Sequence, residues 1–174
     1  MAQQMELAAR IVLTGLGATL FMDIWAVAAE AMFGIPQSSF TMVGRWLGHM
    51  PEGTFVHDSL RRAAPVQGEA AIGWSAHYLT GVLLAALFVA AAGKDQLRHP
   101  RLAPALLFGL VTVVIPFFVL QPATGAGFMA SNKPDPDFAR LKSLMSHISF
   151  GLGLYLAAWV QARLVRMRGR TAAS

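Results

Sequence analysis

The sequence predicts an all-α fold: a polytopic integral membrane protein with four transmembrane helices in a bundle and two long outer loops. Of its 174 residues, 55% are hydrophobic and only 13% are charged, whereas soluble domains average about 45–50% apolar and about 25% charged residues. The apolar residues gather in four segments, each long enough to cross a hydrocarbon core of about 30 Å at about 1.5 Å per residue. We therefore expect a single membrane domain over residues 1–174.

Residues that break helices follow three of the predicted helices. Pro36 follows the first, Gly93 follows the second, and Gln121-Pro122 stops the third. Pro116 should kink the third helix near its far end, because proline lacks the amide hydrogen of an interior helical residue. The expected helices cover residues 7–33, 70–92, 102–120 and 143–165.

The distribution of basic residues predicts the orientation. Ala29-Glu30-Ala31 has the small-x-small pattern of a signal-peptidase site, but the segment before it is too long and contains Asp23, so we expect the first helix to be retained. Four spans then place both termini on one side. The short stretches on that side are basic, so the positive-inside rule puts both termini in the cytoplasm. These basic residues are Arg10, Lys94, Arg98, Arg101, Arg163, Arg166, Arg168 and Arg170.

Composition also excludes several classes of protein. The net charge of +5 comes with no basic patch interleaved with exposed aromatic residues, so we expect the lipid bilayer as a partner and no nucleic acid. The absence of cysteine excludes disulfides, thiolate metal sites and cysteine nucleophiles. A four-helix unit is small for a transport pathway, which favours a homo-oligomer or a larger membrane complex.

Two long segments connect the spans on the outer side, at residues 34–69 and 123–142. Loops of this length are uncommon unless they cover or bind something. In the first of them, the stretch from Phe40 to His49 could form an interfacial helix. The second is rich in turn residues.

Asp23, His77 and His147 are ionisable residues that lie within three of the four apolar segments. A charged group at the centre of a membrane helix costs at least about 2.5 kcal/mol, so each of the three marks a candidate site. Each also lies on a stripe of small residues at helical spacing, which lets membrane helices approach closely. We expect the first, second and fourth helices to meet through these stripes, with Gly81 and Gly151 at the contacts and Leu84 facing lipid. The three side chains should then converge on one polar site in the outer half of the bundle.

Four further polar residues could complete this site. Glu30 and Gln121 lie near its rim, and His49 and His57 lie in the covering loop. The candidate ligand-binding residues are Asp23, His77, His147, Glu30 and Gln121. The candidate metal ligands are His77, His147, Asp23, His49 and His57.

Several motifs together resemble one known family. Gly-Ala-Thr-Leu-Phe-Met-Asp ends at Asp23, Gly-Arg-Trp-Leu-Gly-His ends at His49, and Gly-Trp-Ser-Ala-His-Tyr ends at Tyr78. They are followed by Gln121-Pro122, by residues 140–147 and by Gly-Leu-Gly-Leu-Tyr from residue 151. The chain resembles the bacterial family called domain of unknown function 2938 over nearly its whole length. This resemblance implies a four-helix protein of the bacterial inner membrane and supplies no activity.

Four hypotheses for function remain open. Neutral imidazoles with a carboxylate suit a divalent metal ion, and the same polar site could hold a small solute. A redox subunit could hold haem or quinone through His77 and His147. A membrane enzyme could use Asp23 and His77 as a general base, with Arg45, Arg61 or Arg62 holding an anionic headgroup. The fourth is a structural or partner-binding protein in which the stripes serve packing only, so the sequence does not decide whether the protein is an enzyme.

Overall fold

The computed structural model describes residues 1–171 and the side chains up to Met167, so the side chains of Arg168 and Arg170 lie outside the described part. Within residues 1–171 every regular element is helical and no strand occurs. Four helices are long and apolar enough to cross a membrane, which confirms the predicted fold class. They span Ala2–Phe33, Glu69–Ala92, Leu102–Ala123 and Pro136–Met167.

The first, second and fourth spans are single helices, and the third is interrupted. Helix α1 covers Ala2–Phe33, α3 covers Glu69–Ala92 and α6 covers Pro136–Thr171. The third span begins as α4 (Leu102–Val111), continues through the wide turns of η4 (Pro116–Leu120) and ends as α5 (Gln121–Ala123). Proline donates no amide hydrogen, so the regular α-helix gives way before Pro116, where the sequence predicted a kink.

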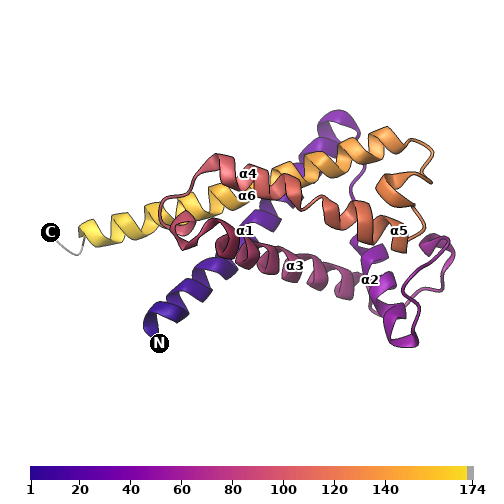
Figure 1. The fold of residues 1–174 in the computed structure, drawn as a ribbon, viewed down its shortest axis with the longest axis horizontal. Coiled ribbons are helices and arrows are strands. Elements are labelled where there is room, and N and C mark those ends of the chain that lie inside the picture. The colour runs from indigo at the N-terminus through magenta and orange to yellow at the C-terminus, as the bar shows by residue number, and fades with distance from the viewer. Residues whose placement is uncertain (172–174) are drawn as a thin grey trace.

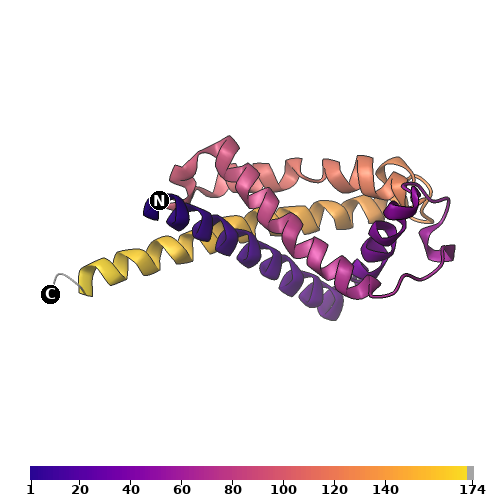
Figure 2. The same ribbon diagram turned by 90° about the horizontal axis from the view of Figure 1, so that it is seen from below.

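Helix α1 packs against both α3 and α6, and α4 packs against α6. Helices α3 and α4 are joined through η3 (Lys94–Leu97) and diverge from there, as Figure 2 shows. The N-terminus and the end of α6 lie at one end of the molecule, which we call the terminal end (Figure 1). The opposite end, which we call the loop end, carries the short helix α2 (Phe40–His49) and residues 124–135.

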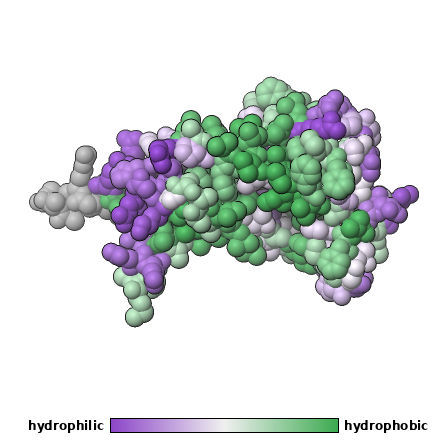
Figure 3. Space-filling model, viewed as in Figure 1, coloured by the Kyte–Doolittle hydropathy of each residue, from purple (hydrophilic) through white to green (hydrophobic). Residues whose placement is uncertain are grey.

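The surface is banded in the way a bilayer requires. Apolar residues cover the middle of the molecule in Figure 3, and hydrophilic residues gather toward its two ends. The large apolar side chains of the band are exposed, for example Leu83 at 60% and Leu107 at 63%. Because hydrocarbon replaces water around a membrane span, these side chains are stable facing outward.

Glycines set the distances between the spans. At Gly81 a Cβ atom would collide with the Thr19 hydroxyl of α1, so the predicted contact of Gly81 is confirmed. At Gly151 the added Cβ would lie 2.7 Å from the Ala105 carbonyl oxygen of α4, so Gly151 faces the third span and not the first or second. Helix α6 meets α1 through Gly153 instead, because two residues along a helix differ by about 200° in direction.

Several expected helix ends need correction. The first helix begins at Ala2 rather than at residue 7, and the third span continues through Pro122 to Ala123. The fourth helix begins at Pro136 rather than at residue 143, so it takes up much of the predicted second loop. Its start is stabilised by the Asp135 carboxylate, which accepts a hydrogen bond of 2.9 Å from the Phe138 amide. In the first loop, the helix expected from Phe40 to His49 is present with those bounds.

Candidate functional site

Helix α2 is fixed against the first turns of α3 by backbone contact. A Cβ atom at Gly44 would overlap the Glu69 carbonyl group, and one at Gly73 would overlap the Phe40 carbonyl group. Arg45 then reaches Glu69, with its Nε and Nη2 atoms each donating a 2.8 Å hydrogen bond to one carboxylate oxygen. This pairing raises the pKa of Arg45. Arg45 is therefore engaged in holding α2 in place, so of the three arginines offered by the enzyme hypothesis it is not free to bind an anionic headgroup.

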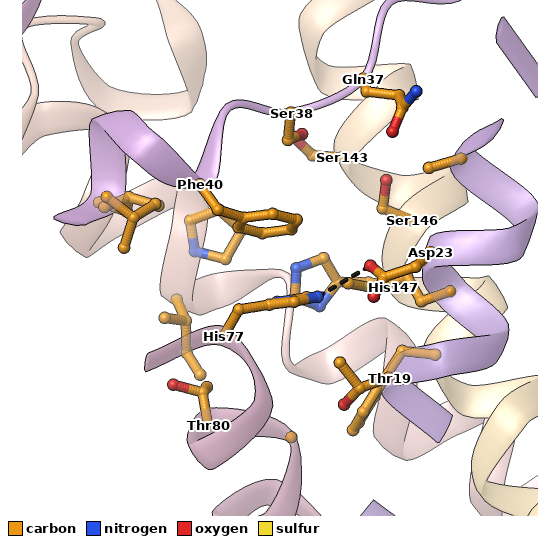
Figure 4. Close-up of a pocket in the computed structure, with 18 of the residues that line it drawn as sticks. Thr19, Asp23, Gln37, Ser38, Phe40, His77, Thr80, Ser143, Ser146 and His147 are labelled. Atoms are coloured by element: carbon orange, nitrogen blue, oxygen red, sulfur yellow. Dashed lines mark hydrogen bonds and ion pairs between the residues drawn. The ribbon is translucent and has the colours of Figure 1, made fainter. Parts of the chain in front are cut away.

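A cavity of about 380 Å³ lies between α1, α3, η4 and α6, and residues of α2 line one side of it. Its walls are mainly apolar and aromatic, and they include Met22, Trp25, Val43, Leu84, Ile115 and Phe150. Leu84 was expected to face lipid and instead faces this cavity, because α3 and α4 diverge here. Fewer of the lining side chains are polar, and these lie at different levels of the cavity, as Figure 4 shows. This set includes Thr19, Ser38, Thr80, Ser143 and Ser146.

Asp23 and His77 form the central polar contact of the cavity (Figure 4). The Nε2 atom of His77 lies 2.9 Å from Oδ1 of Asp23, and the Tyr78 hydroxyl donates a 2.9 Å hydrogen bond to Oδ2. The side chains of His77 and Asp23 are only 9% and 17% exposed. Phe40 of α2 stacks on the His77 ring at a centroid distance of 3.7 Å. The carboxylate is thus held on both oxygens, and α2 covers its imidazole partner.

His147 lines the same cavity from α6 and is held by the third span. Its Nδ1 atom lies 2.8 Å from the Thr112 hydroxyl oxygen, and that hydroxyl donates a 2.6 Å hydrogen bond to the Gly109 carbonyl. The close approach of Gly109 and Gly151 brings the two helices near enough for this contact. Asp23, His77 and His147 therefore share one cavity, and ligand binding by them stays a prediction.

The remaining candidate residues lie elsewhere. Glu30 accepts a hydrogen bond from Gln37 and does not line the cavity. Gln121 donates a 3.3 Å hydrogen bond to Ser143, and its Oε1 atom is buried without a hydrogen-bond partner in the described structure. His49 and His57 pair with each other at 2.8 Å between Nδ1 and Nε2, outside the cavity.

The five candidate metal ligands are thus divided between two places. Three line the cavity, where Asp23 contacts His77 and His147 contacts Thr112. The other two form the His49–His57 pair. Within the described residues, no group of three or more His, Asp and Glu side chains has a geometry that could hold a metal ion.

Three residues of the site were not predicted from the sequence. Tyr78 directly follows His77, and adjacent residues on a helix point about 100° apart, so the stripe argument did not place both at Asp23. Thr112 lies in the third span, which carries no ionisable residue. Phe40 was placed on a helix, but its contact with His77 depends on the Gly44–Gly73 approach.

Four membrane-length helices around a shared cavity define the class: a polytopic all-α membrane protein. A family model described as "Protein of unknown function (DUF2938)" matches residues 12–161. The chain belongs to this family, as its motifs indicated. No curated protein and no solved structure matches it significantly.

Proposed function

We propose that the protein binds a small amphiphilic molecule in the cavity, with its apolar part against the helix walls and its polar head at Asp23, His77 and His147. The observation that carries this proposal is the Asp23–His77 pair at 2.9 Å within a mainly apolar cavity of about 380 Å³. Small-molecule sites commonly have volumes of about 300–1,000 Å³, apolar walls and a few convergent polar groups. A metal ion or free polar solute would make little use of such walls.

The purely structural alternative accounts for the pair and leaves the cavity unexplained. A hydrogen bond between Asp23 and His77 does join α1 to α3. However, helix packing in membranes relies on close contact between small residues, and α1 and α3 already have it at Gly81. An open volume beside two ionisable side chains adds nothing to packing, which is why ligand binding is the better account.

We also propose that the protein lies in the bacterial inner membrane with both termini in the cytoplasm. The α3–α4 connection and the last turns of α6 lie at the terminal end (Figure 1), and both are basic. The positive-inside rule assigns such short basic segments to the cytoplasm. The cavity and its α2 cover then lie in the outer half of the membrane.

Native mass spectrometry of the detergent-purified protein tests the binding proposal. The wild-type protein should carry a co-purifying small amphiphile. The variant Leu84→Trp should lose it, because the larger side chain fills the cavity. Leu83→Trp is the matched control, since Leu83 is 60% exposed on the apolar surface, and this variant should keep the ligand. Size-exclusion profiles establish that both variants are folded.

Two results would contradict the proposal: a wild-type protein with no bound molecule, or equal occupancy in Leu84→Trp and the wild-type protein. The same spectra separate the other hypotheses that use these histidines. A bound divalent metal would add only the mass of one ion, and a haem would appear together with a Soret absorption band.

A further inference from the structure

The Thr112 hydroxyl fixes which nitrogen of His147 carries the proton. Thr112 has one hydroxyl hydrogen, and its oxygen lies 2.6 Å from the Gly109 carbonyl oxygen, which can only accept. The hydroxyl hydrogen must therefore lie in that bond. The 2.8 Å contact between Thr112 and Nδ1 of His147 is then made by the ring, with Nδ1–H donating to the hydroxyl oxygen.

A neutral imidazole that donates from one nitrogen accepts at the other. Nε2 of His147 is consequently a hydrogen-bond acceptor on a side chain that lines the cavity. Among the residues whose side chains the structure describes, none forms a hydrogen bond with Nε2, and Nε2 is not one of the fully buried unpaired atoms. The acceptor is accessible and ready for a donor from a bound molecule.

Three of the polar groups that line the cavity with His147 have no free donor to offer a ligand: Asp23, Thr19 and Ser143. The carboxylate of Asp23 only accepts, so His77 donates its Nε2–H to Asp23. The hydroxyls of Thr19 and Ser143 donate to backbone carbonyls of their own helices. Ser146 can donate or accept, and Lys142 lies more than one helical turn closer to the loop end.

Building on the proposed function, we infer that the head group bound in the cavity is a hydrogen-bond donor, an aromatic hydroxyl of the phenol or hydroquinone class, which donates to Nε2 of His147. A carbonyl or an ether in the same place would face the acceptor lone pair and leave it unpaired. The aromatic side chains that line the cavity, Trp25, Trp46 and Phe40, suit an aromatic ring attached to this hydroxyl. Thr112 acts as a positioning residue for His147.

A matched pair of compounds tests the inference: 4-nonylphenol and 4-nonylanisole, which differ in the O–H group. Binding to the protein in nanodiscs is followed by tryptophan fluorescence, because Trp25 and Trp46 line the cavity. The phenol should bind about fivefold to tenfold more tightly than its methyl ether, which is the contribution expected of one hydrogen bond. Titration of protein-free nanodiscs corrects for partitioning into lipid.

Two variants and a control test whether the preference for the phenol over its methyl ether depends on His147 and Thr112. His147→Phe removes the acceptor, and Thr112→Val removes the group that fixes the His147 tautomer while nearly keeping the side-chain shape. Both should bring the ratio of the two affinities to about one. His99→Phe should keep the wild-type ratio, since His99 is 72% exposed and outside the cavity. If His147→Phe fails to fold, Thr112→Val carries the test.

The outcomes separate this inference from the proposed function. Equal binding of the two compounds by the wild-type protein, or tighter binding of the ether, would overturn the inference and leave ligand binding intact. A preference for the phenol that survives in Thr112→Val would overturn the assignment of His147 Nε2 as the acceptor held by Thr112, and one that survives in His147→Phe would overturn any role of His147. If the protein binds neither compound, and the wild-type protein also carries no ligand in native mass spectra, both the inference and the proposed function are overturned.

Discussion

At the scale of single residues, three ionisable side chains of the spans are the predictable part of the site. Asp23, His77 and His147 could be identified because a charged group facing lipid is costly, whatever the packing. Their partners could not be identified in this way. Tyr78 and Thr112 are ordinary in membrane helices, and their contacts depend on side-chain directions that spacing alone does not give.

Replacing Asp23 should destabilise the protein far more than replacing an exposed aspartate. In Asp23→Asn, the amide accepts only at its oxygen, so one of the Tyr78 and His77 contacts must reverse its hydrogen-bond direction and both lose their charged acceptor. The expected loss is about 1–3 kcal/mol, seen as a lower melting temperature in detergent. The control Asp95→Asn removes a 65% exposed carboxylate paired with His99. Equal melting temperatures of the two variants would contradict the structural importance of Asp23.

At the scale of helices, the sequence predicts which segments are helical better than which faces meet. The span limits follow from apolar length, and α2 matches its predicted bounds. The contact face of α6 was assigned to the wrong neighbours, because Gly151 and Gly153 both belong to small-residue patterns and only the packing shows which partner each one meets. The early start of α6 follows from Asp135-Pro136, a capping signal inside an apparent loop.

The contact between α1 and α3 predicts the effect of enlarging Gly81. Gly81→Leu should sharply reduce the yield of folded protein, because the side chain would collide with Thr19 and force the helices apart. The control is Ala90→Leu, an exposed position on the same helix, which should give wild-type yield. Yield is measured as the monodisperse fraction in size-exclusion chromatography with a fluorescent fusion. A normal yield from Gly81→Leu would show that this contact is wrong.

The pairing of Arg45 with Glu69 predicts how α2 is retained. Arg45→Met removes both 2.8 Å hydrogen bonds and leaves the Glu69 carboxylate without its guanidinium partner, so amides in residues 40–49 should exchange hydrogen faster. Arg61→Met is the control, since Arg61 is exposed and should leave this exchange unchanged. Hydrogen–deuterium exchange in nanodiscs measures both. Identical exchange in the two variants would mean that α2 is held by its glycine contacts alone.

At the scale of the whole molecule, fold class follows from composition and segment length, but the cavity does not. The cavity exists because α3 and α4 diverge from η3 and the third span widens at Pro116. Hydropathy is insensitive to crossing angles, so the sequence predicts neither the cavity volume nor the inward position of Leu84. Polar residues on three spans predict that a shared site is possible, and packing decides its shape.

The arrangement of the two ends predicts the membrane topology. Helix α6 runs from the loop end to the terminal end, so its two ends should lie on opposite sides of the membrane (Figure 1). Reporter fusions after Ser174 should be active as cytoplasmic markers, and fusions within residues 125–135 as markers of the outer side. The opposite pattern would place the cavity in the cytoplasmic half of the membrane.

Whether the cavity is occupied can be seen in a cryo-EM map of the wild-type protein, purified in native lipid without added ligand. We expect density for one bound amphiphile in the cavity, with its head group within hydrogen-bond distance of His147 or the Asp23–His77 pair and its apolar part beside Leu84. A cavity that holds only water, or one closed by α3 and η4 coming together, would contradict it. In that case Asp23, His77 and His147 would serve only to join the helices.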